Sequence, residues 1–296
     1  MTHIAAPPKT GSEIARDRLK RAIRSTIKQT KTRLVNSFLG YDAEKLRVRL
    51  ARAGIRETDT LMVHANFTVD SGFRGTPGDL VNALVELVGK KGNLLMVSIP
   101  FRGSAYDYLL LNKPFNVKKT ISLMGLATEM FRRREGTLRS LHPTHPVLAV
   151  GRDAAWLVAD HEHCPHPCGP NSPFAKLREL NGKILFFDVS FGAITFFHHV
   201  EHLLKDRLPF PVYHERVFTV TAIDAQGESH AIRTQTFNTA VARRAERLEQ
   251  RMLRDGKIRH GRIGNSRFIL VTAEDVVDSF TAMVDAGDHP YQVVHT

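Results

Sequence analysis

The sequence predicts an α/β fold: a single domain with a mixed central sheet flanked by helices, preceded by a basic N-terminal helical arm. From Asp59 onward, short apolar stretches of strand length alternate with amphipathic stretches of helix length. Hydrophobic residues make up 42% and charged residues 24% of the 296 residues, which is typical of a folded globular chain. No apolar run approaches the roughly 18 residues of a membrane span. We therefore expect an arm over residues 1–40 and one domain over residues 41–296.

The arm carries most of the positive charge. The chain has 42 Lys and Arg against 30 Asp and Glu, a net charge of +12, and residues 1–56 alone account for a net charge of +10. The rest of the chain is nearly neutral, so no nucleic-acid partner is expected. An apolar stripe at helical spacing indicates a basic amphipathic helix; its members are Leu19, Ile23, Ile27, Leu34 and Phe38. The sequence favours packing of this stripe on the body or on a sister subunit in a homodimer, and the alternative is peripheral contact with an anionic membrane surface.

The first part of the body shows strand and helix signals in alternation. Residues 60–64 predict a buried strand, residues 77–87 a helix that begins near Pro77, and residues 92–100 the next strand. A polar loop over residues 101–119 is long enough to be functional. A helix running to about Arg134 follows, with Ser122 as its N-cap. Its buried side is expected to hold Met124, Leu126, Met130 and Phe131.

The second part of the body continues with core strands at residues 146–151 and 183–189. Between them, the proline-rich residues 164–173 predict a rigid, exposed loop. Residues 212–223 and 230–234 flank a turn and predict a hairpin. Two cysteines, Cys164 and Cys168, are too few for a disulfide-built fold, and the N-terminus lacks the apolar stretch of a secretory signal. A reduced, cytoplasmic protein is therefore expected.

Two clusters contain the side chains that bind metals. Residues 161–168 carry three His, one Glu and two Cys, and His198 and His202 lie four residues apart. A closed zinc site needs four ligands in a tetrahedron, which one short proline-stiffened run rarely supplies. The second cluster is not the His-Glu-x-x-His pattern of zinc proteases. We expect no metal, and a metal-dependent hydrolase that uses these His and Cys clusters is kept as the alternative function.

Thr195, His198 and Glu201 lie three and three residues apart, so on one helix they would share a side. Together they offer a hydrogen-bond donor, a base that titrates near neutrality, and a carboxylate that can orient the imidazole. The triplet follows a core strand, and the carboxyl ends of strands are where open α/β sheets bind ligands. These are the groups that acyl transfer or hydrolysis requires.

Two further segments are candidates for binding a cofactor. His64, Ala65, Asn66 and Phe67 lie at the end of the first strand, ahead of glycines that lead into a helix whose N-terminus could face an anion. The second segment precedes a core strand and combines a cation, a hydroxyl and an imidazole, which suit phosphate or amide groups. Its members are Arg139, Ser140 and His142.

Six motifs in order resemble the aminoglycoside 3-N-acetyltransferase family over residues 41–285. The motifs are Val63-His-Ala-Asn-Phe, Met124-Gly-Leu with Glu129 and Phe131-Arg, Arg139-Ser-x-His-Pro-Thr-His, Cys168-Gly-Pro-Asn-Ser-Pro-Phe with Lys176-Leu, Thr195-x-x-His-x-x-Glu, and Gly261-Arg-Ile-Gly-Asn. The resemblance implies that residues 41–296 are an acetyltransferase domain. It also implies transfer of an acetyl group from acetyl-CoA to a primary amine of an amino sugar, without a metal.

The resemblance also implies roles for the candidate residues. His198 looks like the general base that takes the proton of the amine, Glu201 like its orienting partner, and Thr195 like a donor to the acyl oxygen or the departing sulfur. His64 to Phe67 and Arg139 to His142 look like the edges that bind acetyl-CoA. The acceptor is either an aminoglycoside, which would imply antibiotic resistance, or another amino sugar of the cell envelope or of secondary metabolism. The nearly neutral body slightly favours the latter, because polycations prefer acidic clefts.

Overall fold

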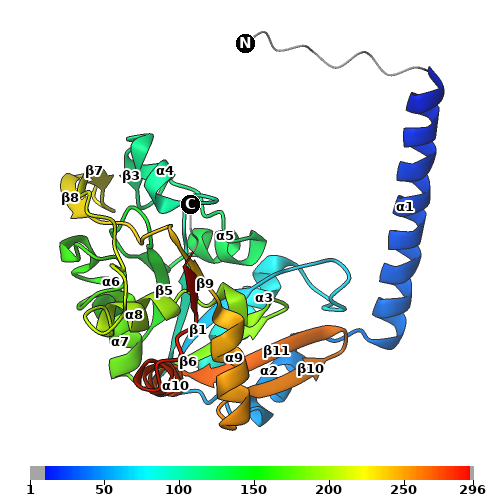
Figure 1. The fold of residues 1–296 in the computed structure, drawn as a ribbon. Coiled ribbons are helices and arrows are strands. Elements are labelled where there is room, and N and C mark those ends of the chain that lie inside the picture. Colours follow the sequence, from blue (N-terminus) through cyan, green and yellow to red (C-terminus); the bar gives the residue numbers. More distant parts are fainter. Residues whose placement is uncertain (1–10, 294–296) are drawn as a thin grey trace.

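A mixed sheet of seven strands forms the centre of the computed structural model, which describes residues 11–293 (Figure 1). The strand order is β10-β11-β6-β1-β2-β5-β4, where β1 is parallel to β2 and β6 and the remaining pairs are antiparallel. The strands are β1 (Thr60–Ala65), β2 (Asn93–Val97), β4 (Leu138–Arg139), β5 (Val147–Gly151), β6 (Lys183–Phe187), β10 (Arg259–Ile263) and β11 (Ser266–Thr272). The predicted fold class, a mixed sheet flanked by helices, is confirmed.

Helices cover both faces of this sheet because its central strands are apolar on both sides. On one face, Leu61 and Val63 pack with helices α2 (Ala43–Arg52), α3 (Pro77–Val88) and α5 (Leu126–Arg133). On the other face, Met62 belongs to a larger core. That core takes in α6 (Ala154–Val158), α7 (Pro173–Glu179), α8 (Phe197–Leu203), α9 (Ala245–Arg254) and α10 (Ala273–Asp285). The expected strand and helix between residues 60 and 88 are confirmed within one or two residues.

Two small sheets lie beside the central one. The predicted hairpin is present as β7 (Phe218–Ile223) and β8 (Ser229–Thr234), and β3 (Phe115–Asn116) adds to it as a third strand. The segment of residues 101–119 is therefore not a plain loop, because it also holds helix α4 (Ala105–Leu110). The second small sheet pairs β9 (Val241–Arg243) with β12 (Tyr291–Val293). It joins the end of the described chain to the segment that follows the hairpin.

The arm forms helix α1 (Gly11–Phe38), which stands apart from the body in Figure 1. Its apolar stripe does not pack on the body, because Leu19, Ile23 and Leu34 are exposed and Phe38 is 81% exposed; packing on a sister subunit stays a prediction. The side chain of Ile27 lies outside the described residues. Among the α1 side chains that the structure describes, Val35, on another side of the helix, is the buried one. None of the described helices is long and apolar enough to cross a membrane.

Two other local expectations are wrong. Helix α5 begins after Gly125 and not at Ser122, whose backbone N–H instead donates to Glu129 at 3.0 Å. The helix buries Ala127, Thr128 and Phe131, whereas the predicted Met124, Leu126 and Met130 are largely exposed.

The segment of residues 164–173 is also more buried than expected. Both cysteines are buried free thiols. Cys164 donates to backbone carbonyls, and Cys168 belongs to the larger core. Burial raises the pKa of Cys164 to about 11, and it also raises the pKa of Cys168 well above its usual value. Neither thiol is activated as a nucleophile at neutral pH.

Candidate active site

Helix α8 brings His198 and Glu201 together on one side. The chain leaves β6 at its carboxyl end, makes a short 3-10 turn (Phe191–Ala193) and enters the helix, which is anchored in the core by Phe197 and Val200. Residues three apart on a helix lie on neighbouring positions. The Nδ1 atom of His198 lies 2.5 Å from Oε2 of Glu201, as the spacing predicted.

Arg243 completes this group from strand β9. Its Nε donates to both carboxylate oxygens of Glu201, at 2.9 and 3.0 Å. The Glu201 side chain is 0% exposed, whereas His198 and Arg243 are about one fifth exposed. Burial favours the neutral form of Glu201, but His198 and Arg243 together hold the pKa of the carboxyl below its usual value. Glu201 is therefore a buried carboxylate that contacts the imidazole of His198 on one side and the guanidinium of Arg243 on the other.

His198 is held as a neutral base with one nitrogen available. Because the Glu201 carboxylate only accepts, the hydrogen bond requires the proton of a neutral His198 on Nδ1 and leaves Nε2 as the acceptor. Burial lowers the pKa of His198, the Glu201 carboxylate partly offsets this effect, and the charge of Arg243 lowers the pKa further. The imidazole is thus unprotonated near neutrality, as a general base must be.

Thr195 is not part of the helix, because α8 begins at Phe197. The expectation that all three residues share one helical face is correct only for His198 and Glu201. Thr195 is buried just before the helix, and its backbone carbonyl accepts the N–H of His198 at 3.1 Å. The neighbouring His199 points elsewhere, since its Nδ1 contacts the carbonyl of Cys168 at 2.8 Å.

Sequence reasoning assigned no role to three residues around His198. Phe237 stacks on the His198 ring with 4.0 Å between ring centroids, and Arg243 lies over the same phenyl ring. His145 contacts His198 edge-on with 6.0 Å between ring centroids. His145 stood inside a quoted motif and could have been chosen. Arg243 is 42 residues from Glu201, and no local pattern reveals that contact.

Arg139, Ser140 and His142, predicted as an edge that binds acetyl-CoA, are buried in this structure. The Arg139 guanidinium lies over the Phe115 ring and donates to the carbonyls of Ser98 and Thr120, at 2.8 and 2.5 Å. Both terminal nitrogens of Arg139 thus donate to backbone carbonyls, whereas its Nε is buried without a hydrogen-bond partner. Arg139 thus connects strand β4 to the two ends of the segment of residues 101–119.

The other two members of that segment are also engaged in the interior. Ser140 accepts the N–H of Val147 at 2.8 Å and contacts Nδ1 of His161 at the same distance. His142 stacks on His161 with 4.5 Å between ring centroids. Burial, followed by the charges of neighbouring histidines, lowers the pKa of His142 well below its usual value. The segment is a structural element of the core.

His64, Ala65, Asn66 and Phe67 lie at the carboxyl end of β1, as predicted. His64 stacks on Phe186 with 5.3 Å between ring centroids, and its Nε2 atom is buried without a hydrogen-bond partner. Burial lowers the pKa of His64 to about 4. Asn66 is exposed, and its backbone N–H donates to the carbonyl of Phe187. This segment stays a candidate for contact with a coenzyme.

The two groups of metal-binding residue types considered in the sequence do not converge on a common point. His161 contacts Ser140 and the carbonyl of Pro167, while His202 contacts the hydroxyl of Tyr213. Within residues 11–293, the group with metal-ligand geometry is a different one, Asp224, Glu228 and His230 at the hairpin turn. In residues 161–168, His161, Cys164 and His166 make other hydrogen bonds.

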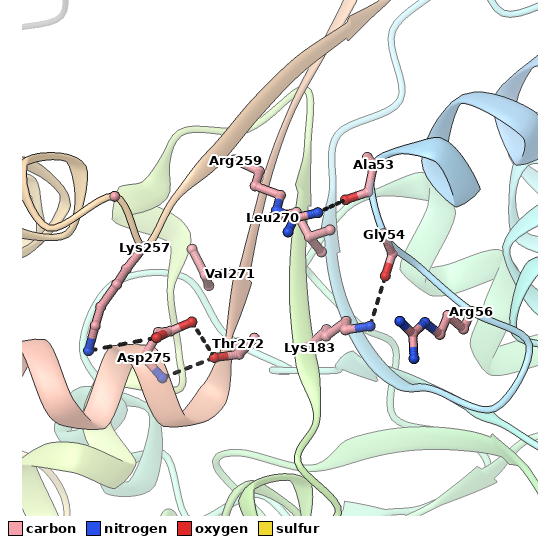
Figure 2. Close-up of a pocket in the computed structure, with 11 residues that line it drawn as sticks. Ala53, Gly54, Arg56, Lys183, Lys257, Arg259, Leu270, Val271, Thr272 and Asp275 are labelled. Carbon is pink, nitrogen blue, oxygen red and sulfur yellow. Dashed lines mark hydrogen bonds and ion pairs between the residues drawn. The ribbon is translucent and has the colours of Figure 1, made fainter.

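A cavity of about 290 Å³ lies at the opposite end of the central strands, where β1 and β6 begin (Figure 2). Arg56, Lys183, Lys257 and Arg259 line it, together with Asp275 and the N-terminus of α10. The Lys183 ammonium contacts Asp59, and the Arg259 guanidinium donates to the carbonyl of Ala53. His198 follows the other end of β6, so this cavity does not belong to the candidate site.

A family model described as aminoglycoside 3-N-acetyltransferase matches residues 62–285. The chain belongs to this family. A curated relative, aminoglycoside N(3)-acetyltransferase VII of Streptomyces paromomycinus, is 28% identical over 82% of this chain and 93% of its own. The type IX enzyme of Micromonospora chalcea is 24% identical over 82% of this chain and 92% of its own. The resemblance seen in the motifs is confirmed, and the chain is an acyltransferase.

Solved structures show the same fold. Aminoglycoside acetyltransferase AAC(3)-Xa aligns with a TM-score of 0.72 at 23% identity, over 86% of this chain and 95% of its own. AAC-IIIb in a binary complex with CoASH aligns with a TM-score of 0.71 at 24% identity, over 84% of this chain and 98% of its own. The comparisons give no support to the metal-dependent hydrolase.

Proposed function

We propose that the protein transfers the acetyl group of acetyl-CoA to a primary amine of an amino sugar, with His198 as the general base. The observation that carries the proposal is the His198–Glu201 contact beside Arg243, in a chain of this family. The related AAC-IIIb was solved with CoASH, and the related AAC-VIa with sisomicin. An aminoglycoside or a similar amino sugar is therefore the acceptor class.

In the proposed reaction, the free amine attacks the thioester carbonyl while Nε2 of His198 takes a proton from the nitrogen. The new C–N bond forms as the C–S bond breaks, and the His198 imidazolium returns the proton to the CoA thiolate. Glu201 holds the Nδ1–H of His198 and stabilises the imidazolium that forms. Thr195 is assigned as a donor to the acyl oxygen or the sulfur. No enzyme nucleophile is needed, because the thiolate is a good leaving group.

Binding of acetyl-CoA is proposed at the carboxyl ends of the central strands, with His64, Ala65, Asn66 and Phe67 as one edge. Asn66 is exposed at the end of β1, and the segment of Gly125 lies next to Ala65. Arg139, Ser140 and His142 are not carried into this proposal, since their polar groups are engaged in the interior. The buried free thiols are compatible with the proposed cytoplasmic location.

A thiol-release assay with acetyl-CoA tests the function against a panel of aminoglycosides, other amino sugars and nucleotide-linked amino sugars. We expect release only when an amino sugar is present. A separate melting experiment tests the donor: a ligand that binds only the native state at one hundred times its Kd stabilises by about 2.7 kcal/mol. Acceptor-independent release, or no melting shift at millimolar acetyl-CoA, would contradict the proposal.

A further inference from the structure

We propose that Arg243 is a positioning residue of the acetyl transfer: it balances the charge of Glu201 so that His198 remains a neutral base. This inference rests on the proposed function of His198. It concerns a residue from a distant part of the chain, held by contacts that the catalytic helix does not provide. Arg243 does not touch the reacting atoms, and it acts through Glu201.

The geometry fixes the Arg243 side chain from two directions. While Nε donates to both oxygens of Glu201, Nη1 donates to the carbonyls of Asn238 and Val241 at 3.1 and 3.4 Å. The guanidinium is a rigid planar group, so these contacts together define its orientation. It can therefore hold the carboxylate in one position, with Oε2 directed at His198.

The C-terminal strand holds Arg243 in place. Strand β12 pairs with β9 so that Tyr291 lies opposite Arg243. The Tyr291 ring packs edge-on against Phe197 of the catalytic helix, with 5.7 Å between ring centroids. The same strand thus pairs with the backbone of Arg243 and contacts the helix that carries Glu201. The contact between Arg243 and Glu201 is therefore partly buried and fixed by its surroundings, unlike an exposed ion pair at the protein surface.

The charge balance explains why the site needs a third member. A buried carboxylate whose only cationic partner is a histidine stabilises the imidazolium form of that histidine. A base that is already protonated cannot take the proton of the amine. Because Arg243 is permanently charged, it neutralises Glu201 and leaves His198 free to accept a proton.

The titratable and charged groups that face this pair come from several elements. Glu201 and His198 are on α8, and Arg243 is on β9. The other groups that influence them are His145 before β5, Cys168 before α7, Tyr213 before β7, and Tyr291 on β12. Of these, Cys168, Tyr213 and Tyr291 have a raised pKa, mainly from burial, and His145 has a lowered one for the same reason. All four are neutral at pH 7, which leaves Arg243 as the permanent cation in contact with Glu201.

The test is the pH profile of kcat/KM, measured by thiol release for Arg243→Gln, Arg243→Lys and the native enzyme. Arg247→Gln is the matched control, because Arg247 makes an exposed ion pair with Asp288. Ionisation of the acceptor amine is common to all variants, so a difference between profiles reports on the enzyme. Acetyl-CoA affinity and circular dichroism melts are recorded in parallel.

We expect the acidic limb of Arg243→Gln to move upward by about one pH unit or more, the usual effect of losing a nearby charge. At pH 6 the activity then falls about tenfold and recovers toward pH 9. Arg243→Lys keeps a cation, so its limb stays near that of the native enzyme, and Arg247→Gln keeps the native profile. Acetyl-CoA affinity is unchanged in all three variants.

An equal loss at every pH, or a native profile in Arg243→Gln, overturns the inference. If Arg243→Gln does not fold, an NMR titration of His198 in the native enzyme decides, and an imidazolium at pH 7.5 overturns it. If His198→Ala keeps full activity, the proposed function itself fails. If His198 is essential but the limb does not move, only the role of Arg243 fails.

Discussion

Two histidine-bearing segments of the molecule contain similar residues but differ in their surroundings. Around His142, the imidazoles are fully buried and their hydrogen-bond partners are neutral or belong to the backbone. Around His198, the imidazole is 21% exposed and contacts a buried carboxylate. Both segments have the polar composition of a site. Partial exposure together with a charged partner, and not the presence of histidine, is therefore the reason for proposing His198 and not His142 as the general base.

The largest expected effect separates His198 from its neighbour. His198→Ala is expected to reduce kcat by about 10² to 10⁴, the usual cost of losing a general base, while acetyl-CoA binding stays nearly native. His199→Asn is the matched control, because an asparagine amide can replace the Nδ1 contact to the carbonyl of Cys168. Steady-state rates and acetyl-CoA titrations measure both effects. Equal losses in the two variants would mean that the base has been misassigned.

The next effect concerns the loss of folding stability in acid, which tests whether the buried histidines are kept neutral. Burial lowers the pKa of His161 to about 3 and that of His199 to about 4, against the usual value of about 6.5. Because the unfolded chain binds these protons first, stability is fully present above about pH 6.5 and is lost as the pH falls. Each histidine contributes about 1.4 kcal/mol per pH unit in that range. Urea midpoints at pH 7.5 and pH 5 check this, and equal midpoints would show that the histidines are not buried.

A smaller effect is expected at His142. His142→Ala removes a buried group that lies within 3.4 Å of the N–H groups of Thr144 and His145, which costs about 1 to 3 kcal/mol of stability. The KM for acetyl-CoA should not change, because the imidazole does not reach the surface. Thermal melts and steady-state kinetics of the same preparation measure the two quantities. An increase in KM at native stability would return His142 to the coenzyme site.

The smallest effect is expected at the cysteines. Cys164→Ser should keep nearly native kcat, since the thiol is buried and its pKa is raised to about 11. Direct transfer in a ternary complex requires no thiol, and mass spectrometry after incubation with acetyl-CoA should show no acetylated cysteine. A trapped acetyl group on Cys164 or Cys168 would show instead that transfer proceeds through the enzyme.

The sequence was informative where a local period determines the structure. Alternating apolar stretches predicted the strands around residues 60–64 and 183–189, and the spacing of three placed Glu201 beside His198. It failed where burial depends on distant partners. Leu126 and Met130 were expected inside because they are apolar, but the side of α5 that faces α3 carries Ala127 and Phe131.

The same limit explains the errors within the site. Arg139 is of a residue type that binds anions, yet its guanidinium lies over the Phe115 ring and donates to the carbonyl of Ser98. Neither partner is near Arg139 in sequence. Arg243 went unnoticed because its partner is 42 residues away. For the arm, of the two predicted partners of its apolar stripe, the body leaves Leu19 and Ile23 exposed, and a sister subunit stays a prediction.

A histidine-resolved NMR titration tests the central claim most directly. The imidazole signals of His198 and His142 can be assigned from the spectra of His198→Gln and His142→Gln, and followed while acetyl-CoA and an amino sugar are added. The account predicts that the His198 signals move on addition of both substrates. It also predicts that the pKa of His198 in the native enzyme lies below the usual value of a histidine. It predicts that the His142 signals stay unchanged until acid unfolds the protein. Signals of His142 that respond to the substrates, with His198 silent, would contradict the account.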